Sequence, residues 1–192
     1  MALRFNKLFK FYQNTLGRRP MLTQAIQVGV LMGTGDAISQ LLVEKTSFKS
    51  FDTVRTLRFA SIGCFMVGPV LRVWYGVLNR YVGSSGTTVA LKKVFFDQAL
   101  FAPSFIICLL SVVGFTQGKE WTHIKKDMES NYVDVLKTNY LIWPWVQLGN
   151  FYYVPLHYQV LVAQVVALFW NTYLSWKTNK SLKKDIQILE KQ

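Results

Sequence analysis

Four long apolar segments alternate with short polar segments along the chain. They cover Met21–Val43, Leu57–Asn79, Val94–Gln117 and Val154–Trp176. Each reaches the length of about 20 mostly apolar residues that a helix needs to cross a bilayer. Glycines, glutamines and a few charges interrupt the first three segments, which is typical of helices that pack against one another in a membrane. The pattern predicts an all-α integral membrane protein with four transmembrane helices in a single membrane domain over residues 1–192.

Two further segments show the periodicity of amphipathic helices. Apolar residues share one helical face in residues 1–20, and basic residues lie on the opposite face. Such a start is typical of a mitochondrial targeting helix and equally of a helix that lies on anionic lipid, so both interpretations stay open. The apolar residues of 121–140 follow the same spacing and predict a second interfacial helix. A basic tail, 177–192, ends the chain.

The composition narrows the class of protein. Charged residues make up 17% of the chain, where a water-soluble domain usually carries about 25%. The connecting segments cannot supply enough polar surface to coat four apolar helices, which disfavours a soluble bundle or a soluble enzyme. The 51% of hydrophobic residues excludes a disordered chain.

The 22 Lys and Arg residues outnumber the 10 Asp and Glu residues, which gives a net charge of +12. The basic residues lie mainly at the ends of the apolar segments, so we expect contacts with membrane lipid and no direct binding of nucleic acid. Four crossings would place the N-terminus, segment 80–93 and the tail on one side of the membrane. That side would carry most of the basic residues.

A few polar side chains fall inside the predicted spans. A buried Asp costs a few kcal/mol in a membrane unless it is paired or hydrated, so Asp36 either lines an aqueous path or bonds a neighbouring helix. Depth along the spans places Asp36 near Arg55 and Arg58, and it allows an ion pair between Arg72 and Asp97. The candidates for lining a polar path are Asp36, Gln40, Arg72 and Asp97.

Small residues and prolines predict how the spans pack. Gly29 and Gly33 belong to a stripe of small residues that lets two helices approach closely. Gly68-Pro69 and Pro103 interrupt the second and third spans, and a proline removes a helical hydrogen bond. The resulting kinks serve either as a gate or as static packing features.

The sequence lacks the motifs of common enzymes and metal sites. Gly118-Lys119 is followed by Glu120, so it is not the phosphate-binding lysine motif, and the two histidines, His123 and His157, have no metal-ligand spacing. Cys64 and Cys108 lie in apolar segments, and we expect two buried thiols. We therefore expect no enzyme, no metal and no cofactor.

An ordered set of motifs covers nearly the whole chain. It includes Gly35-Asp36 with Gln40, Arg55-Thr56, Gly68-Pro69 and Asp97-Gln98, and it continues with Trp143, Pro144, Gln147, Asn150, Phe151, Pro155, Trp170 and Ser175. The set resembles the twenty-two-kilodalton peroxisomal membrane protein family, and most of all its mitochondrial inner-membrane branch, which is linked to maintenance of mitochondrial DNA. In one departure, Gln159 stands where the family often has Arg.

The resemblance implies a weakly selective channel or pore of the mitochondrial inner membrane. In that branch, such a protein supports the control of membrane potential and reactive oxygen species, the deoxynucleotide supply and mitochondrial DNA. The partners that follow are membrane lipid, anionic metabolites or nucleotides, and further copies of the chain in a homo-oligomer. Two alternatives stay open: a non-transporting membrane scaffold or assembly factor, and a location in the peroxisomal membrane.

Overall fold

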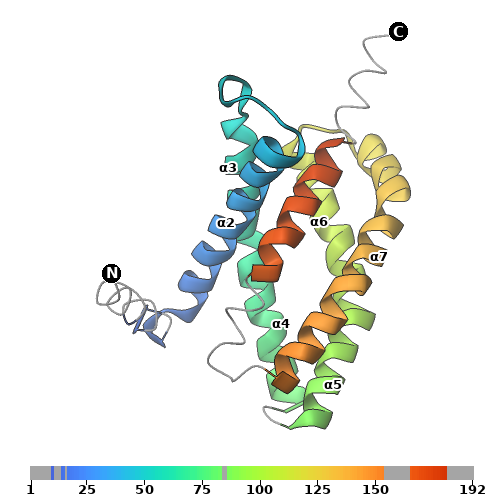
Figure 1. Cartoon of the computed structure of the whole chain (residues 1–192). Coiled ribbons are helices and arrows are strands. Elements are labelled where there is room, and N and C mark those ends of the chain that lie inside the picture. Colours follow the sequence, from blue (N-terminus) through green and yellow to red (C-terminus); the bar gives the residue numbers. More distant parts are fainter. Residues whose placement is uncertain (1–9, 11–13, 16, 84–85, 154–164, 181–192) are drawn as a thin grey trace.

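Every regular element in the described part of the chain is a helix (Figure 1). The structure, a computed structural model, describes residues 10, 14–15, 17–83, 86–153 and 165–180. The first rod consists of α2 (Pro20–Ile38) and the π-helical turn η1 (Ser39–Val43). After a loop that contains the short helix η2 (Phe48–Ser50), the second rod is formed by α3 (Thr53–Ile62), the π-helical turn η3 (Gly63–Val67) and α4 (Gly68–Tyr81).

A hairpin leads into the third rod, which packs beside the later helices. It consists of α5 (Thr87–Phe96), the π-helical turn η4 (Asp97–Phe101) and α6 (Ala102–Thr116). The next helix, α7, covers Trp121–Tyr153, and residues 165–180 form a last helix.

Three of these rods are long and apolar enough to cross a membrane. They cover Pro20–Val43, Thr53–Tyr81 and Thr87–Thr116, in agreement with the first three predicted spans. The second and third rods begin earlier than predicted, because Asp52 caps α3 by accepting a hydrogen bond from the backbone of Arg55 and because α5 starts directly after the hairpin. Only the second half of the fourth predicted span, Val154–Trp176, lies within the described residues, as part of the helix over 165–180.

The prolines of the second and third rods each follow a π-helical turn. Pro69 is the second residue of α4, directly after η3, and Pro103 is the second residue of α6, directly after η4. A proline has no N–H to donate and its ring collides with the carbonyl one turn earlier. The extra residue of a π-helical turn relieves that collision, so each rod continues through its proline.

Helix α7 corrects the predicted interfacial helix over 121–140. That segment is helical, but α7 continues through Pro144 to Tyr153 and comprises 33 residues. Its apolar face packs inside the bundle against α6, with Ile124 and Val135 fully buried. The same helical periodicity describes a helix on a membrane surface and one in a bundle, so the spacing alone could not separate them.

The direction of the last helix corrects the predicted arrangement of the basic segments. Helix α7 runs the length of the bundle, and the helix over 165–180 returns beside α2 (Figure 1). Ser175 contacts Asp36 near the loop between α2 and α3, at the end opposite the α4–α5 hairpin. Segment 80–93 and residues 177–180 therefore lie at opposite ends, and the prediction that segment 80–93 and the tail share one side is wrong for the described part.

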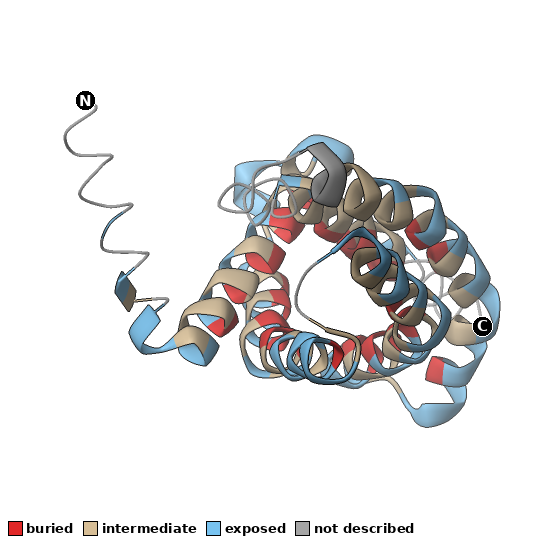
Figure 2. Cartoon of the chain, turned by 90° about the horizontal axis from the view of Figure 1, so that it is seen from below, coloured by how far each residue is buried: buried red, intermediate tan, exposed pale blue. Residues whose placement is uncertain are grey.

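The bundle has an apolar exterior and a mixed interior. Buried residues of all the long helices face inward (Figure 2). The apolar core draws on α2, α3, α6, α7 and the last helix, with Met32, Phe59, Ile106, Val135 and Leu174 as members. Large apolar side chains such as Phe65, Leu141 and Phe169 are exposed, as is Cys108, which was expected to be buried. Apolar surface outside and charged groups inside suit lipid as the surrounding solvent.

Glycines allow α2 to contact its neighbours at backbone distance. A Cβ atom on Gly29 would lie 2.8 Å from the carbonyl oxygen of Ala60, and one on Gly63 would lie 2.8 Å from the Cα atom of Gly29. A Cβ atom on Gly68 would lie 2.7 Å from the Cα atom of Ala25. These separations are too short for any side chain, so the α2 contact with the second rod depends on glycine.

The close contact predicts that Gly29→Leu destabilises the chain. We expect a loss of about 1–3 kcal/mol in the free energy of unfolding, because the added side chain must push α2 and α3 apart. Thermal unfolding in detergent measures it. Gly76→Leu is the matched control, since nothing lies within 4 Å of its added Cβ atom. Equal losses for both variants would contradict the packing argument.

Candidate functional site

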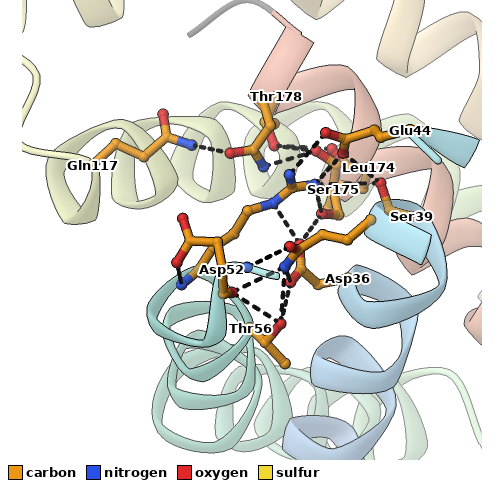
Figure 3. A network of polar contacts seen from close by, with 12 residues as sticks. Asp36, Ser39, Glu44, Asp52, Thr56, Gln117, Leu174, Ser175 and Thr178 are labelled. Carbon is orange, nitrogen blue, oxygen red and sulfur yellow. Dashed lines mark hydrogen bonds and ion pairs between the residues drawn. The ribbon is translucent and has the colours of Figure 1, made fainter. Parts of the chain in front are cut away.

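A polar network is buried at the end of α2, and Asp36 is its centre (Figure 3). The Asp36 side chain has no exposed surface. Its Oδ1 lies 2.7 Å from Nε of Arg55 and accepts a hydrogen bond of 2.5 Å from the Ser175 hydroxyl. Its Oδ2 accepts from Thr56 Oγ1 at 2.5 Å and from Gln40 Nε2 at 2.9 Å. Four polar contacts thus occupy the acceptor positions of a carboxylate.

Arg55 connects Asp36 to a second carboxylate. Its Nη1 and Nη2 donate to the two oxygens of Glu44 at 3.1 Å and 2.6 Å, in a bidentate pair. Nη2 also contacts the hydroxyls of Ser39 at 3.3 Å and Ser175 at 3.0 Å. One guanidinium therefore lies between the buried Asp36 carboxylate and the partly buried Glu44 carboxylate, and the planar fork of arginine suits this role better than lysine does.

Gln40 holds the loop between the first two rods. Its Oε1 accepts from the backbone N–H of Asp52 at 2.8 Å, and its Nε2 donates to the backbone carbonyl of the same residue at 3.0 Å. Gln40 therefore pairs with the Asp52 backbone as a second strand would, which fixes the start of α3. The predicted pairing of Asp36 with the start of the second span is confirmed, and Arg55 rather than the exposed Arg58 is its partner.

Ser175 brings the last helix into the network. It is fully buried, and its hydroxyl contacts both Asp36 and Arg55. Gly35 permits this approach, because a Cβ atom there would lie 2.7 Å from the Cβ atom of Asn171, one turn before Ser175. This contact joins the last helix to α2, between residues that are 139 positions apart in the sequence.

A separate cavity of about 220 Å³ lies inside the bundle. Its wall is mostly apolar, and its lining combines residues of α2, the second and third rods, α7 and the last helix. Its polar side chains are Tyr75, Asp97, Gln98, Asn139, Gln147 and Asn171. A mostly apolar cavity with a few convergent polar groups is the common form of a small-molecule site.

Asp97 is the one formally charged residue among the described residues that line this cavity. It accepts hydrogen bonds from Trp74 Nε1 and Gln98 Nε2, both at 2.9 Å. Gln98 Oε1 accepts in turn from Asn139 Nδ2 at 2.8 Å. This chain of contacts ties α4, η4 and α7 together along one wall.

Aromatic rings form the neighbouring wall. The Trp74 ring stacks on Phe101 at 4.9 Å between centroids, and Phe101 stacks on Phe105 at the same separation. Trp143 of α7 meets Trp170 of the last helix edge to face at 6.4 Å. These contacts fix the shape of the cavity from both sides.

The predicted path-lining residues fall into three places. Asp36 and Gln40 belong to the buried network, and Asp97 lines the cavity. Arg72 is exposed and lines neither, and the hypothetical ion pair between Arg72 and Asp97 is absent from the described part of the chain. Arg72 and Trp74 are two positions apart on one helix, a rotation of about 200°, so the Trp74 contact with Asp97 turns Arg72 away.

The motif residues of the second half converge on the same two places. Trp143, Gln147 and Trp170 line the cavity, and Ser175 belongs to the network. Pro144 lies inside α7. The side chains of Asn150 and Phe151, and Pro155 altogether, lie outside the described residues.

Sequence reasoning missed several members of the network. Ser39, Glu44 and Asp52 are common polar residues at the end of a span or in a loop, and their spacing carried no signal of a shared site. Among the residues that the structure describes, no group of three or more His, Cys, Asp and Glu side chains could hold a metal ion.

These features define an integral membrane protein of helices, with polar contacts inside an apolar-surfaced bundle. A family profile described as Mpv17 / PMP22 family matches residues 114–175. The "Mitochondrial inner membrane protein Mpv17" of Xenopus laevis is 45% identical over 174 residues, which cover 91% of this chain and 98% of the relative. The protein of that name in Homo sapiens is 45% identical over 177 residues, with 90% and 98% covered.

A more distant relative extends the match to a fungus. "Protein sym-1" of Neurospora crassa is 38% identical over 172 residues, which cover 88% of this chain and 98% of that protein. The chain belongs to the Mpv17 / PMP22 family. The predicted location in the mitochondrial inner membrane agrees with the names of the animal relatives. No solved structure matches the chain.

The buried ion pair predicts strong coupling between Asp36 and Arg55. Arg55→Ala should cost about 3–5 kcal/mol of unfolding free energy, because it leaves the buried Asp36 without its cation. Asp36→Ala should cost less than this, because Arg55 keeps its pair with Glu44. The double variant should cost at least about 1 kcal/mol less than the sum. Denaturant unfolding in mixed micelles measures all three.

Arg58→Ala provides the control for this cycle. It removes an exposed arginine one turn from Arg55, so the expected change is below about 0.5 kcal/mol. Additive costs at Asp36 and Arg55 would show that the pair does not act as a unit.

Proposed function

We propose that the chain is a weakly selective channel or pore of the mitochondrial inner membrane. The observation that carries this proposal is the cavity of about 220 Å³ with Asp97, Gln98 and Asn139 in its wall, inside a bundle whose outer surface is apolar. Polar groups inside a membrane protein are expensive unless they pair or meet water. A cluster of them around an internal space therefore favours a path for polar solutes.

A carboxylate in the cavity wall and a lysine one helical turn away favour weak selectivity. Asp97 places a carboxylate in the cavity wall, and Lys93 lies one helical turn earlier on the same rod, at the hairpin end. Basic residues at a mouth raise the local concentration of anionic metabolites such as nucleotides, whereas a carboxylate further inside favours cations. The two fields oppose each other, so neither sign of ion is strongly excluded.

The cellular role follows from the resemblance stated above. As a pore, the chain would support the control of membrane potential and reactive oxygen species, the deoxynucleotide supply and maintenance of mitochondrial DNA. Copies of the chain would assemble as a homo-oligomer if one cavity is too narrow for such solutes. The proposal assigns no catalytic step to the chain.

Planar-bilayer recording tests the channel proposal. Purified protein should conduct, and Asp97→Asn should shift the permeability ratio towards anions because it removes the carboxylate from the cavity wall. Glu129→Gln is the matched control, since it removes an exposed carboxylate from α7 outside the cavity, and its permeability ratio should stay unchanged. Absence of conductance from the pure protein would reject the pore.

A membrane scaffold or assembly factor is the second candidate function. The observation that favours it is the Asp36 carboxylate, which is fully buried and fully paired within the chain. A group of this kind can specify helix pairing without meeting a solute. In that case the polar network would serve only to hold the bundle together.

Asp36→Asn separates the two functions. The amide keeps the shape of the side chain but removes the charge opposite Arg55. For a pore we expect the permeation per molecule to change more than the abundance of the protein in the membrane. Loss of function in strict proportion to abundance would favour the scaffold. Immunoblotting and liposome flux on the same preparation provide both quantities.

A further inference from the structure

The hairpin between α4 and α5 carries a groove that the pore proposal does not use. Its lining is apolar and aromatic apart from one lysine, and it consists of Tyr81, Val82, Leu91, Lys92, Phe95 and Phe96. Tyr81 and Phe95 are largely exposed, and the Phe95 and Phe96 rings meet edge to face at 5.7 Å. Exposed aromatic side chains of this kind are common where a protein meets the edge of a bilayer.

The charge around this groove is positive, and the nearest acid in sequence, Asp97, is buried in the wall of the internal cavity. No Asp or Glu occurs between Asp52 and Asp97. Lys92 lines the groove, and the Arg80 guanidinium lies 5.8 Å from the centre of the Tyr81 ring. The Lys93 amine donates to Asn79 Oδ1 at 2.6 Å, which ties the two helices together across the hairpin.

The groove lies where two rods end. Tyr81 is the last residue of the membrane-spanning candidate Thr53–Tyr81, and Thr87 is the first residue of the candidate Thr87–Thr116. The Tyr81 side of the groove therefore lies at the end of a candidate span, and Phe95 lies about two helical turns inside the next one. Near the end of a span, a basic residue beside an apolar wall meets both parts of a phospholipid.

We propose that this groove binds an anionic phospholipid from the surrounding bilayer. Lys92 and Arg80 contact the headgroup phosphate, and Leu91 and Phe95 contact the first part of an acyl chain. The positive charge, with the nearest acid in sequence buried, is the reason to name an anionic lipid rather than a zwitterionic one. The inference needs the chain to be in a membrane, but it does not depend on conduction.

Lipid retention by the full-length chain tests the proposal. The chain is purified in a neutral detergent and titrated with phosphatidylglycerol or phosphatidylcholine, and bound lipid is counted by native mass spectrometry. Phosphatidylglycerol should bind more tightly, and Arg80→Gln with Lys92→Gln should weaken its binding by about tenfold to thirtyfold, because each basic residue adds to the attraction. The preference for phosphatidylglycerol should then disappear.

The matched control removes two charges from the other end of the bundle. Lys125→Gln with Lys126→Gln changes two exposed lysines of α7 and should alter phosphatidylglycerol binding by less than about twofold. Equal weakening by both pairs, or none by either, would overturn the proposal. Equally tight binding of phosphatidylcholine to the unchanged chain would overturn it as well.

Two further measurements keep the result unambiguous. Glycerol phosphate tests for a site that needs only a free phosphate, and its full displacement of the lipid would contradict a lipid groove. Lys92→Gln alone changes one exposed residue of α5, so it provides a folded variant if the double change lowers the yield. It should weaken phosphatidylglycerol binding by about threefold to fivefold.

Discussion

The ion pair between Asp36 and Arg55 is the interaction on which the bundle depends. Two opposite charges removed from solvent are stabilising only when their remaining donors and acceptors are also satisfied. Thr56, Gln40 and Ser175 satisfy Asp36, and Glu44 satisfies the far side of Arg55. These partners come from η1, the loop that follows it, α3 and the last helix. The requirement to satisfy one buried pair therefore sets the position of four separate segments.

Hydrophobic pattern predicted the three apolar rods because length and composition alone decide whether a helix can cross a bilayer. Depth along those rods was enough to place Asp36 beside Arg55. The course of α7 was not predictable in this way. Its spacing fits a surface helix as well as a bundle helix, and Pro144 indicates an end where the helix in fact continues.

The other contacts of the network could not be predicted from a single sequence, and the reason is different. The Ser175 hydroxyl meets an Asp 139 positions earlier, and no local periodicity records a contact at that separation. Arg72 is the opposite case, a predicted contact that is absent from the residues that the structure describes. Its depth suited Asp97, but depth fixes only the position along a helix, and the Trp74 contact fixes the rotation that turns Arg72 outward. To predict which side chains pair inside a bundle, both the position along each helix and the rotation about its axis must be known.

The network and the cavity together restrict how a pore through this bundle would open. No member of the network lines the cavity in the described part of the chain, so in the proposed pore a path from the cavity to the end of α2 would separate contacts around Asp36. Breaking only the Ser175 contact leaves Asp36 and Arg55 buried, each without one hydrogen-bond partner. The free energy of this state is higher than that of the intact network and higher than that of a network in which water has replaced the contacts. A partly opened network is therefore the least stable of the three. Opening at this end would be all-or-none, with water replacing the Ser175, Thr56 and Gln40 contacts in one step.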